Sequence, residues 1–198
     1  ELYPEAPIAP AELTGTLVEA EGAVAAVAAA NIGENGLELR ARVLVDDVTA
    51  SGRTRAAAGL AADHFASVIA NPPYFDVASG TPAAPERGAA RQMGATNLEL
   101  WIKAAATHAA PGGEAIVIYP ATGLQALLAG LGRRFGDIRV LPLCPREGAP
   151  ATRVIVRGIK GSRAPLTLMA SRALHGPTGR TFTPEFEAIL RGDAVLDW

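Results

Sequence analysis

Residues 65–74 read Phe-Ala-Ser-Val-Ile-Ala-Asn-Pro-Pro-Tyr, an apolar run that ends at an asparagine and two prolines. The apolar run predicts a buried strand over residues 65–70. The prolines support this reading, because proline lacks a backbone N–H and pushes the preceding residue away from helix. In open α/β sheets ligands bind at the carboxyl ends of the strands, where this strand delivers Asn71. The Asn71 amide offers a donor and an acceptor together, and the ring of Tyr74 can lie flat on a planar group. This stretch therefore indicates a binding site for a planar amide or an exocyclic amine. The alternative is a Pro-Pro turn followed by a surface tyrosine.

The composition bounds the kind of protein. With 198 residues and an apolar fraction of 49%, the chain suits a single domain over residues 1–198. No apolar stretch reaches the roughly 18 residues of a membrane span, and no secretory leader opens the chain. The single cysteine, Cys144, cannot form an internal disulfide, so we expect a cytoplasmic protein. His64, His108 and His175 are scattered without a zinc-type spacing, so we expect no metal.

Apolar periodicity and turn residues predict the order of the elements. We expect strands at 13–19, 42–45, 65–70, 115–119, 138–143 and 153–158, with a further one near 166–169. We expect helical segments at 20–30, 97–110 and 122–135, and a short helical or irregular stretch at 51–60. We also expect a break at 111–113 and a loop rich in Pro, Gly and Ala at 76–91. The resulting β-α-β-α-β-α-β-α-β-β order predicts an α/β fold. Its sheet would be mostly parallel with helices on both faces, and 138–143 and 153–158 would form an antiparallel hairpin.

Charge is unevenly distributed along a chain whose net charge is −2. Residues 1–129 hold 7 basic and 14 acidic side chains, whereas residues 130–180 hold 10 basic and 2 acidic ones. Nine of those ten bases are arginines, which suit bidentate contact with phosphate. Residues 130–180 are therefore a candidate nucleic-acid surface; the alternative is an ordinary solvated face.

The tetrapeptide at 71–74 resembles motif IV of the S-adenosylmethionine-dependent amino-methyltransferases, whose pattern is Asn/Asp/Ser-Pro-Pro-Tyr/Phe/Trp. The resemblance implies a Rossmann-like class I methyltransferase fold and S-adenosyl-L-methionine as cofactor. It implies that Asn71, which also borders the cofactor, and the carbonyl of Pro72 accept hydrogen bonds from the target NH2 group. Tyr74 would stack on the target, with Phe75 as a further platform.

Two acids at strand ends fit the same resemblance. Glu19 ends the first expected strand, where a carboxylate can accept both hydroxyls of a ribose, and it matches the family's motif II acid. Asp47 follows the second expected strand, where the family places an acid on the amino group of the cofactor's adenine. Asp47 matches that position better than Asp46. The alternative for each acid is a helix N-cap or an exposed loop.

The family's glycine-rich turn, Asp-x-Gly-x-Gly, does not occur upstream of Glu19. Residues 1–10 look like the end of the helix that would follow such a turn. We therefore expect the native protein to carry roughly 50–70 more residues at its N-terminus, including the first strand of the sheet.

From Glu12 onward the chain most resembles the tRNA1(Val) adenine-37 N6-methyltransferases and their bacterial relatives. The similar stretches are 68–74, 100–103, 111–113, 160–163 and 181–185. The resemblance implies methylation of N6 of adenine in tRNA, with RNA as the partner. The candidate phosphate contacts are Arg153, Arg157, Lys160 and Arg163, for which the alternative is simple surface charge.

Other functions stay open at this point. A protein-glutamine N5-methyltransferase acting on release factors shares the Asn-Pro-Pro-Tyr motif, but it would need no large basic face. A small-molecule methyltransferase and a non-catalytic protein with the methyltransferase fold are the remaining alternatives.

Overall fold

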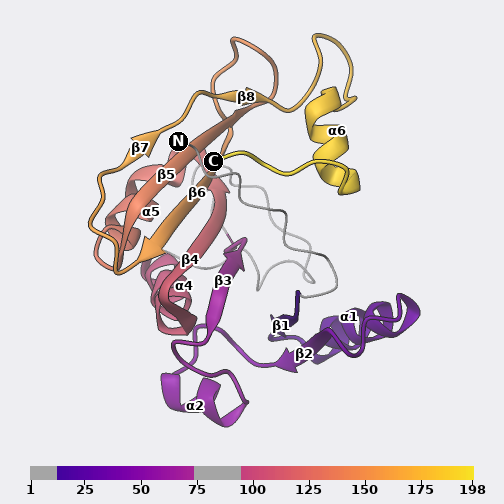
Figure 1. The fold of residues 1–198 in the computed structure, drawn as a ribbon, viewed down its shortest axis with the longest axis vertical. Helices are drawn as coiled ribbons and strands as arrows, with labels where there is room; N and C mark the ends of the chain where they lie inside the picture. Colours follow the sequence, from indigo (N-terminus) through magenta and orange to yellow (C-terminus); the bar gives the residue numbers. More distant parts are fainter. Residues whose placement is uncertain (1–12, 74–94) are drawn as a thin grey trace, which may run out of the picture. The chain divides into compact units, whose positions relative to one another are not determined.

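The computed structural model describes residues 13–73 and 95–198, and its contacts divide the chain into two compact units (Figure 1). The N-terminal unit runs to Ala61 and the C-terminal unit begins at Ala62. The expectation of a single domain over residues 1–198 stays a prediction.

The N-terminal unit is a β-α-β arrangement followed by a short helix. Its elements are β1 (Gly15–Glu19), α1 (Gly22–Glu34), β2 (Ala41–Val45) and α2 (Gly52–Ala57). β1 and β2 pair in parallel, with Gly15 opposite Ala41 and Glu19 opposite Val45. Both strands therefore end at the same edge of this small sheet, as the alternating order of elements predicted.

Local hydrogen bonds explain where α2 begins and how the preceding turn is held. Ser51 is the N-cap, because its hydroxyl accepts a hydrogen bond from the Thr54 N–H at 3.2 Å. Arg55 is buried and donates to the carbonyl oxygens of Val48, at 3.0 Å, and Ala50. These bonds fix the turn that follows β2.

The C-terminal unit is built on a six-stranded sheet. Its elements are β3 (Phe65–Ala70), α4 (Ala95–His108), β4 (Ala109–Pro120), η1 (Ala121–Gly123), α5 (Leu124–Leu131), β5 (Phe135–Cys144), β6 (Arg153–Lys160), β7 (Thr167–Leu168), β8 (Arg172–Ala173) and α6 (Pro184–Arg191). The strand order is β3-β4-β6-β5-β7, and β8 also pairs with β5. Only the pairings of β6 with β4 and β5 are antiparallel among the described strands.

The reversed direction of β6 gives this sheet two distinct edges. At one edge β3, β4 and β5 end while β6 begins at Arg153, which pairs with Pro120 and Leu143. We call it the carboxyl edge. At the other edge β3 and β5 begin and β6 ends at Lys160, which pairs with Phe135. We call it the opposite edge.

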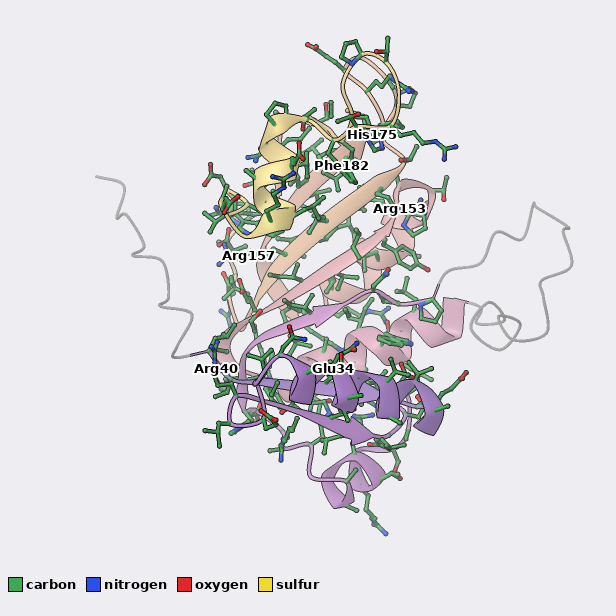
Figure 2. All side chains as sticks on the ribbon, turned by 90° about the vertical axis from the view of Figure 1, so that its right-hand side faces the viewer. Glu34, Arg40, Arg153, Arg157, His175 and Phe182 are labelled. Carbon is green, nitrogen blue, oxygen red and sulfur yellow. The ribbon has the colours of Figure 1, made fainter. Side chains whose placement is uncertain are left out.

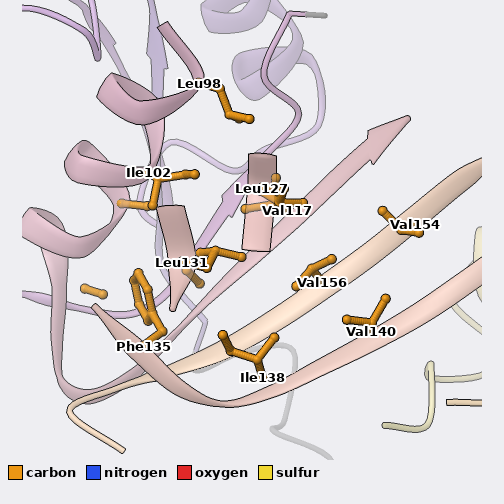
Figure 3. Close-up of a cluster of buried hydrophobic side chains, with 13 residues drawn as sticks. Leu98, Ile102, Val117, Leu127, Leu131, Phe135, Ile138, Val140, Val154 and Val156 are labelled. Atoms are coloured by element: carbon orange, nitrogen blue, oxygen red, sulfur yellow. The ribbon is translucent and has the colours of Figure 1, made fainter. Parts of the chain in front are cut away.

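Helices cover both faces of this sheet. Val154 and Val156 of β6 belong to a buried cluster with Ile102 of α4 and Leu127 of α5 (Figure 3). Ile155, between the two valines, packs on the other face in a cluster that contains Leu141, Leu143 and Phe186 of α6. This alternation follows from the two-residue period of a strand. It confirms the predicted α/β fold with helices on both faces and the predicted antiparallel hairpin.

Two local expectations need correction. The expected break at 111–113 is not present, because β4 begins at Ala109 and runs through these residues. Gly113 is needed there, since a Cβ would lie 2.9 Å from the carbonyl oxygens of Phe65 and Ala66. The helix expected over 122–135 is shorter, because η1 occupies its start, α5 ends at Leu131 and Phe135 already opens β5.

Two elements of the C-terminal unit, β8 and α6, were not predicted. The α6 signals are present: Thr183 caps the helix, Pro184 begins it, and Gly192 follows it with a φ of 81°. The loop expected at 76–91 lies outside the described residues. In the described part of the chain, no helix is both long and apolar enough to cross a membrane.

Candidate active site

Asn71 emerges at the carboxyl edge, directly after β3. The last residue of β3, Ala70, pairs with Val117 in the parallel ladder between β3 and β4. Pro72 is fully buried, whereas Asn71 is exposed. A buried proline with fixed φ anchors the backbone, so the neighbouring amide is held at the edge rather than left on a free loop. Tyr74 and Phe75 lie outside the described residues.

Tyr119 stands near the end of β4, the strand beside β3. A Cβ at Gly123 would overlap the Tyr119 ring, so the absence of a side chain there lets the ring lie against the η1 turn. Burial raises the pKa of the Tyr119 hydroxyl above its ordinary value. The hydroxyl therefore stays protonated at neutral pH and can donate a hydrogen bond near the carboxyl edge. Tyr119 was not among the predicted site residues, although its position near the end of an apolar strand is a signal for such a site.

Glu19 is the last residue of β1 and Asp47 follows β2, the parallel strand beside it, so both acids lie at strand ends as predicted. The Oε1 atom of Glu19 accepts a hydrogen bond from the Glu21 N–H at 2.9 Å. The Oδ1 atom of Asp47 accepts from the N–H and the hydroxyl of Thr49, each at 2.7 Å. These local bonds orient both carboxylates. Each keeps a second oxygen for which the described residues supply no hydrogen-bond donor.

Asp46 is a further acid that the sequence analysis ranked below Asp47. Its backbone N–H donates to the Glu19 carbonyl oxygen at 3.0 Å, so it lies beside the end of β1. Its Oδ2 atom is buried and has no hydrogen-bond partner among the described residues. Buried polar atoms are normally satisfied, so this oxygen is an unsatisfied acceptor next to the end of β2. The signal was the Asp-Asp pair itself, because adjacent residues at a strand end point to different sides.

The structure separates the four basic residues that the sequence placed on RNA. Arg153 lies at the carboxyl edge, where its Nη1 atom donates to the Thr152 carbonyl oxygen at 3.1 Å. Arg157 lies within β6, pairs with Glu114 at 2.5 Å, and has its guanidinium carbon 5.9 Å from the centroid of the Trp198 ring (Figure 2). Its charge is therefore already used inside the protein.

Lys160 and Arg163 lie at the opposite edge. The Lys160 Nζ atom contacts the Asp63 carboxylate at 2.5 Å and the carbonyl oxygens of Ala106 and Ala109 at 2.5 and 2.8 Å. Arg163 is exposed and lines a cavity of about 430 Å³ together with apolar residues such as Leu128 and Phe135. Neither residue shares an edge with Asn71.

Within the C-terminal unit, the structure therefore brings Asn71, Tyr119 and Arg153 to one edge of the sheet. The acids Glu19, Asp46 and Asp47 gather at the corresponding edge of the N-terminal unit. In the described part of the chain, no group of three or more His, Cys, Asp or Glu side chains is arranged to hold a metal ion.

Comparisons with known proteins identify the family. No family model matches the sequence, and no curated protein matches it. Among solved structures, a protein from Agrobacterium tumefaciens described as a predicted O-methyltransferase is similar, with a TM-score of 0.74 and 30% identity. The match covers 91% of this chain and 78% of the other. A SAM-dependent O-methyltransferase from Thermotoga maritima shares the fold at a TM-score of 0.50 and 16% identity, over 76% of this chain and 51% of the other. This chain belongs to the class I methyltransferase family that includes the Agrobacterium protein.

Proposed function

We propose that this protein is an S-adenosylmethionine-dependent N-methyltransferase that acts on an exocyclic amine of a nucleic-acid base, namely N6 of adenine in tRNA. The observation that carries the proposal is the Asn-Pro-Pro corner. Asn71 is exposed at the carboxyl edge, and the fully buried Pro72 fixes it there. In a methyltransferase fold, an amide held rigidly at this edge is suited to orient an NH2 group.

The chain's own part in the reaction is orientation. The side-chain oxygen of Asn71 and the carbonyl of Pro72 would accept hydrogen bonds from the two N–H groups of the target amine, which turns the nitrogen lone pair toward the methyl donor. Tyr74, and Phe75 beside it, would stack on the base. A strong base is not required, because the cofactor supplies an already activated methyl group.

The acids of the N-terminal unit fit the polar parts of S-adenosylmethionine. A ribose and an adenine amine present hydrogen-bond donors, and the carboxylates of Glu19 and Asp47 are oriented acceptors with one oxygen still available. The buried Oδ2 atom of Asp46 is a third acceptor, for which the described residues supply no hydrogen-bond donor. We assign the ribose to Glu19 and the adenine amine to Asp47, with Asp46 beside it.

RNA is the favoured substrate because of charge. Residues 130–180 hold ten basic and two acidic side chains, and nine of the bases are arginines. An adenine in a tRNA loop is readily splayed out, so presenting its amine to Asn71 costs little unstacking. A tRNA substrate places the protein in the cytoplasm.

Methyl transfer to oxygen is the second candidate. It is favoured by the descriptions of the similar Agrobacterium and Thermotoga proteins as O-methyltransferases. The two candidates differ in the acceptor atom of the product, which the following experiment reads directly.

The full chain is incubated with S-adenosylmethionine labelled in the methyl group, and with unfractionated bacterial tRNA or a release factor in parallel. Asn71→Ala serves as the matched blank. Labelled tRNA is digested to nucleosides, and the modified nucleoside is identified by mass and retention. Label in N6-methyladenosine is the expected result.

The other outcomes each contradict the proposal in a distinct way. Label in a 2′-O-methyl nucleoside would establish the oxygen acceptor instead. Label in the release factor would move Asn71 onto a glutamine amide. Label in neither, while the cofactor still binds, would exclude both macromolecules as substrates and leave a small molecule or a non-catalytic role.

A further inference from the structure

Two loops meet at the carboxyl edge of the C-terminal unit: residues 145–152 between β5 and β6, and residues 174–183 between β8 and α6. We call them the edge loops. They lie side by side because β8 runs parallel to the end of β5, with Ala173 paired to Cys144 (Figure 1). The His175 N–H donates to the Pro145 carbonyl oxygen at 3.1 Å, and Arg146 Nη2 donates to the Gly179 carbonyl oxygen at 2.8 Å. The edge loops are therefore one connected surface.

The edge loops carry positive charge that the protein does not neutralise. Six of the ten basic residues in 130–180 form ion pairs with acids: Arg133, Arg134, Arg139, Arg157, Lys160 and Arg172. Arg146 and Arg180 are exposed and form no ion pair within the described residues. Glu147 is the single acid in the two loops.

An aromatic pair lies on the same surface. The rings of His175 and Phe182 have centroids 5.0 Å apart at an angle of 33°, and Phe182 remains 41% exposed. Figure 2 shows this pair at the same end of the sheet as Arg153, with Arg157 farther along. Exposed aromatic rings beside arginines are the chemistry that binds unstacked RNA, because every base has a face that can stack.

The sheet sets the spacing between this surface and Asn71. Three inter-strand steps separate β3 from β5, and at about 4.8 Å a step this is on the order of 15 Å. A few nucleotides can bridge such a distance, so one RNA loop can reach Asn71 and the edge loops together.

We infer that the edge loops are the RNA-binding surface of this protein, with Arg146 and Arg180 on phosphates and Phe182 under a base that flanks the target. The inference rests on the proposed function. It places RNA on the carboxyl edge and not on Arg157, Lys160 or Arg163. The charges of Arg157 and Lys160 are bound within the protein, and Arg163 lies at the opposite edge.

The test compares variants at the two edges of one sheet. Binding of unfractionated bacterial tRNA to the full chain is measured over a series of salt concentrations for Arg180→Ala, Arg146→Ala/Arg180→Ala and Phe182→Ala. Arg163→Ala is the matched control, since Arg163 is an exposed arginine of the same basic segment at the opposite edge. The melting temperature and the affinity for S-adenosylmethionine show that each variant is folded.

We expect Arg180→Ala to lower the magnitude of the salt slope by about 1 and the double variant by about 2. Phe182→Ala should weaken binding by about fivefold or more at unchanged slope, because it removes stacking rather than charge. Arg163→Ala should leave both quantities unchanged. Methylation of tRNA with normal binding by all edge-loop variants would overturn this inference and leave the proposed function standing. An absence of tRNA binding and methylation in the unchanged protein would overturn both.

Discussion

The two edges of the C-terminal sheet contain the same kinds of residue and use them differently. At the opposite edge, Lys160 is held by Asp63 and two backbone carbonyls, and Arg133 and Arg134 share Glu99. At the carboxyl edge, Asn71, Arg146 and Arg180 are exposed. Lys160, Arg133 and Arg134 are therefore part of the structure, whereas Asn71, Arg146 and Arg180 are available to a ligand.

The difference shows why a basic segment should not be treated as one surface. Arg153 and Lys160 belong to the same strand, but seven steps of about 3.3 Å place them roughly 23 Å apart, at different edges of the sheet. The direction of a strand thus decides which of its charges can face the substrate.

The largest effect is expected at Asn71. Asn71→Ala should lower the rate of methyl transfer by about 100- to 1000-fold, because under the proposed function it removes the acceptor that orients the reacting amine. The affinity for S-adenosylmethionine should stay within a few-fold. Single-turnover rates and equilibrium binding separate the two effects.

The matched control for Asn71 is Asn71→Asp, which keeps an acceptor oxygen and should retain more activity than the alanine variant. A near-normal rate for Asn71→Ala would remove this residue from the mechanism and end the functional distinction between the edges.

The second prediction compares one substitution at both edges. Gly136→Ala at the opposite edge should lower the free energy of unfolding by about 1–3 kcal/mol, because the new Cβ would overlap the backbone carbonyl of Ser162. In an edge loop, the new Cβ of Gly176→Ala would have no atom within 4 Å, so this substitution should change the free energy of unfolding by less than about 0.5 kcal/mol. Urea denaturation measures both. Equal losses would show that the edges are equally packed.

The third prediction concerns the contribution of the Lys160 ammonium group to stability. Lys160→Met should destabilise the fold by about 1–2 kcal/mol, because the ammonium donates to Asp63 and to the carbonyls of Ala106 and Ala109. Arg163→Met, three residues away and exposed, should be nearly neutral. If Lys160→Met proved neutral while tRNA binding fell, Lys160 would belong to the substrate surface after all.

The smallest effect is a pH dependence at Tyr119. Burial raises the pKa of its hydroxyl above the ordinary value of 10.0, so the unfolded chain loses this proton first as pH rises. The corresponding stability is present below pH 10 and is lost as pH rises through the folded pKa. Tyr119→Phe should lack this part of the alkaline decline, which urea denaturation between about pH 9 and pH 11 would show. Parallel declines in both proteins would contradict the assignment.

Much of the fold could be predicted from local sequence. The strand at 65–70 matches β3 residue for residue, because an apolar run is terminated by Asn71 and Pro72. The predicted hairpin was also confirmed, as were the end of the first strand at Glu19 and the end of the second strand just before Asp46 and Asp47. The prediction for residues 111–113 was wrong. Glycine usually ends an element, but Gly113 is required inside β4 because the backbone of β3 lies close to it.

Local sequence is enough to predict the order of the elements and the corner that holds Asn71, because periodicity, fixed φ and a missing N–H act within a few residues of the chain. Which charges are available depends on contacts between distant parts of the chain. Lys160 finds Asp63 at a separation of 97 residues, and Arg157 finds Glu114 at 43, through strand pairing and packing that no local pattern encodes. Arg146 and Arg180 face solvent because β5, β6 and β8 bring their loops to the edge where β3 delivers Asn71. Local sequence thus accounts for the position of the Asn71 amide, and long-range strand pairing accounts for the exposure of Arg146 and Arg180 at the same edge.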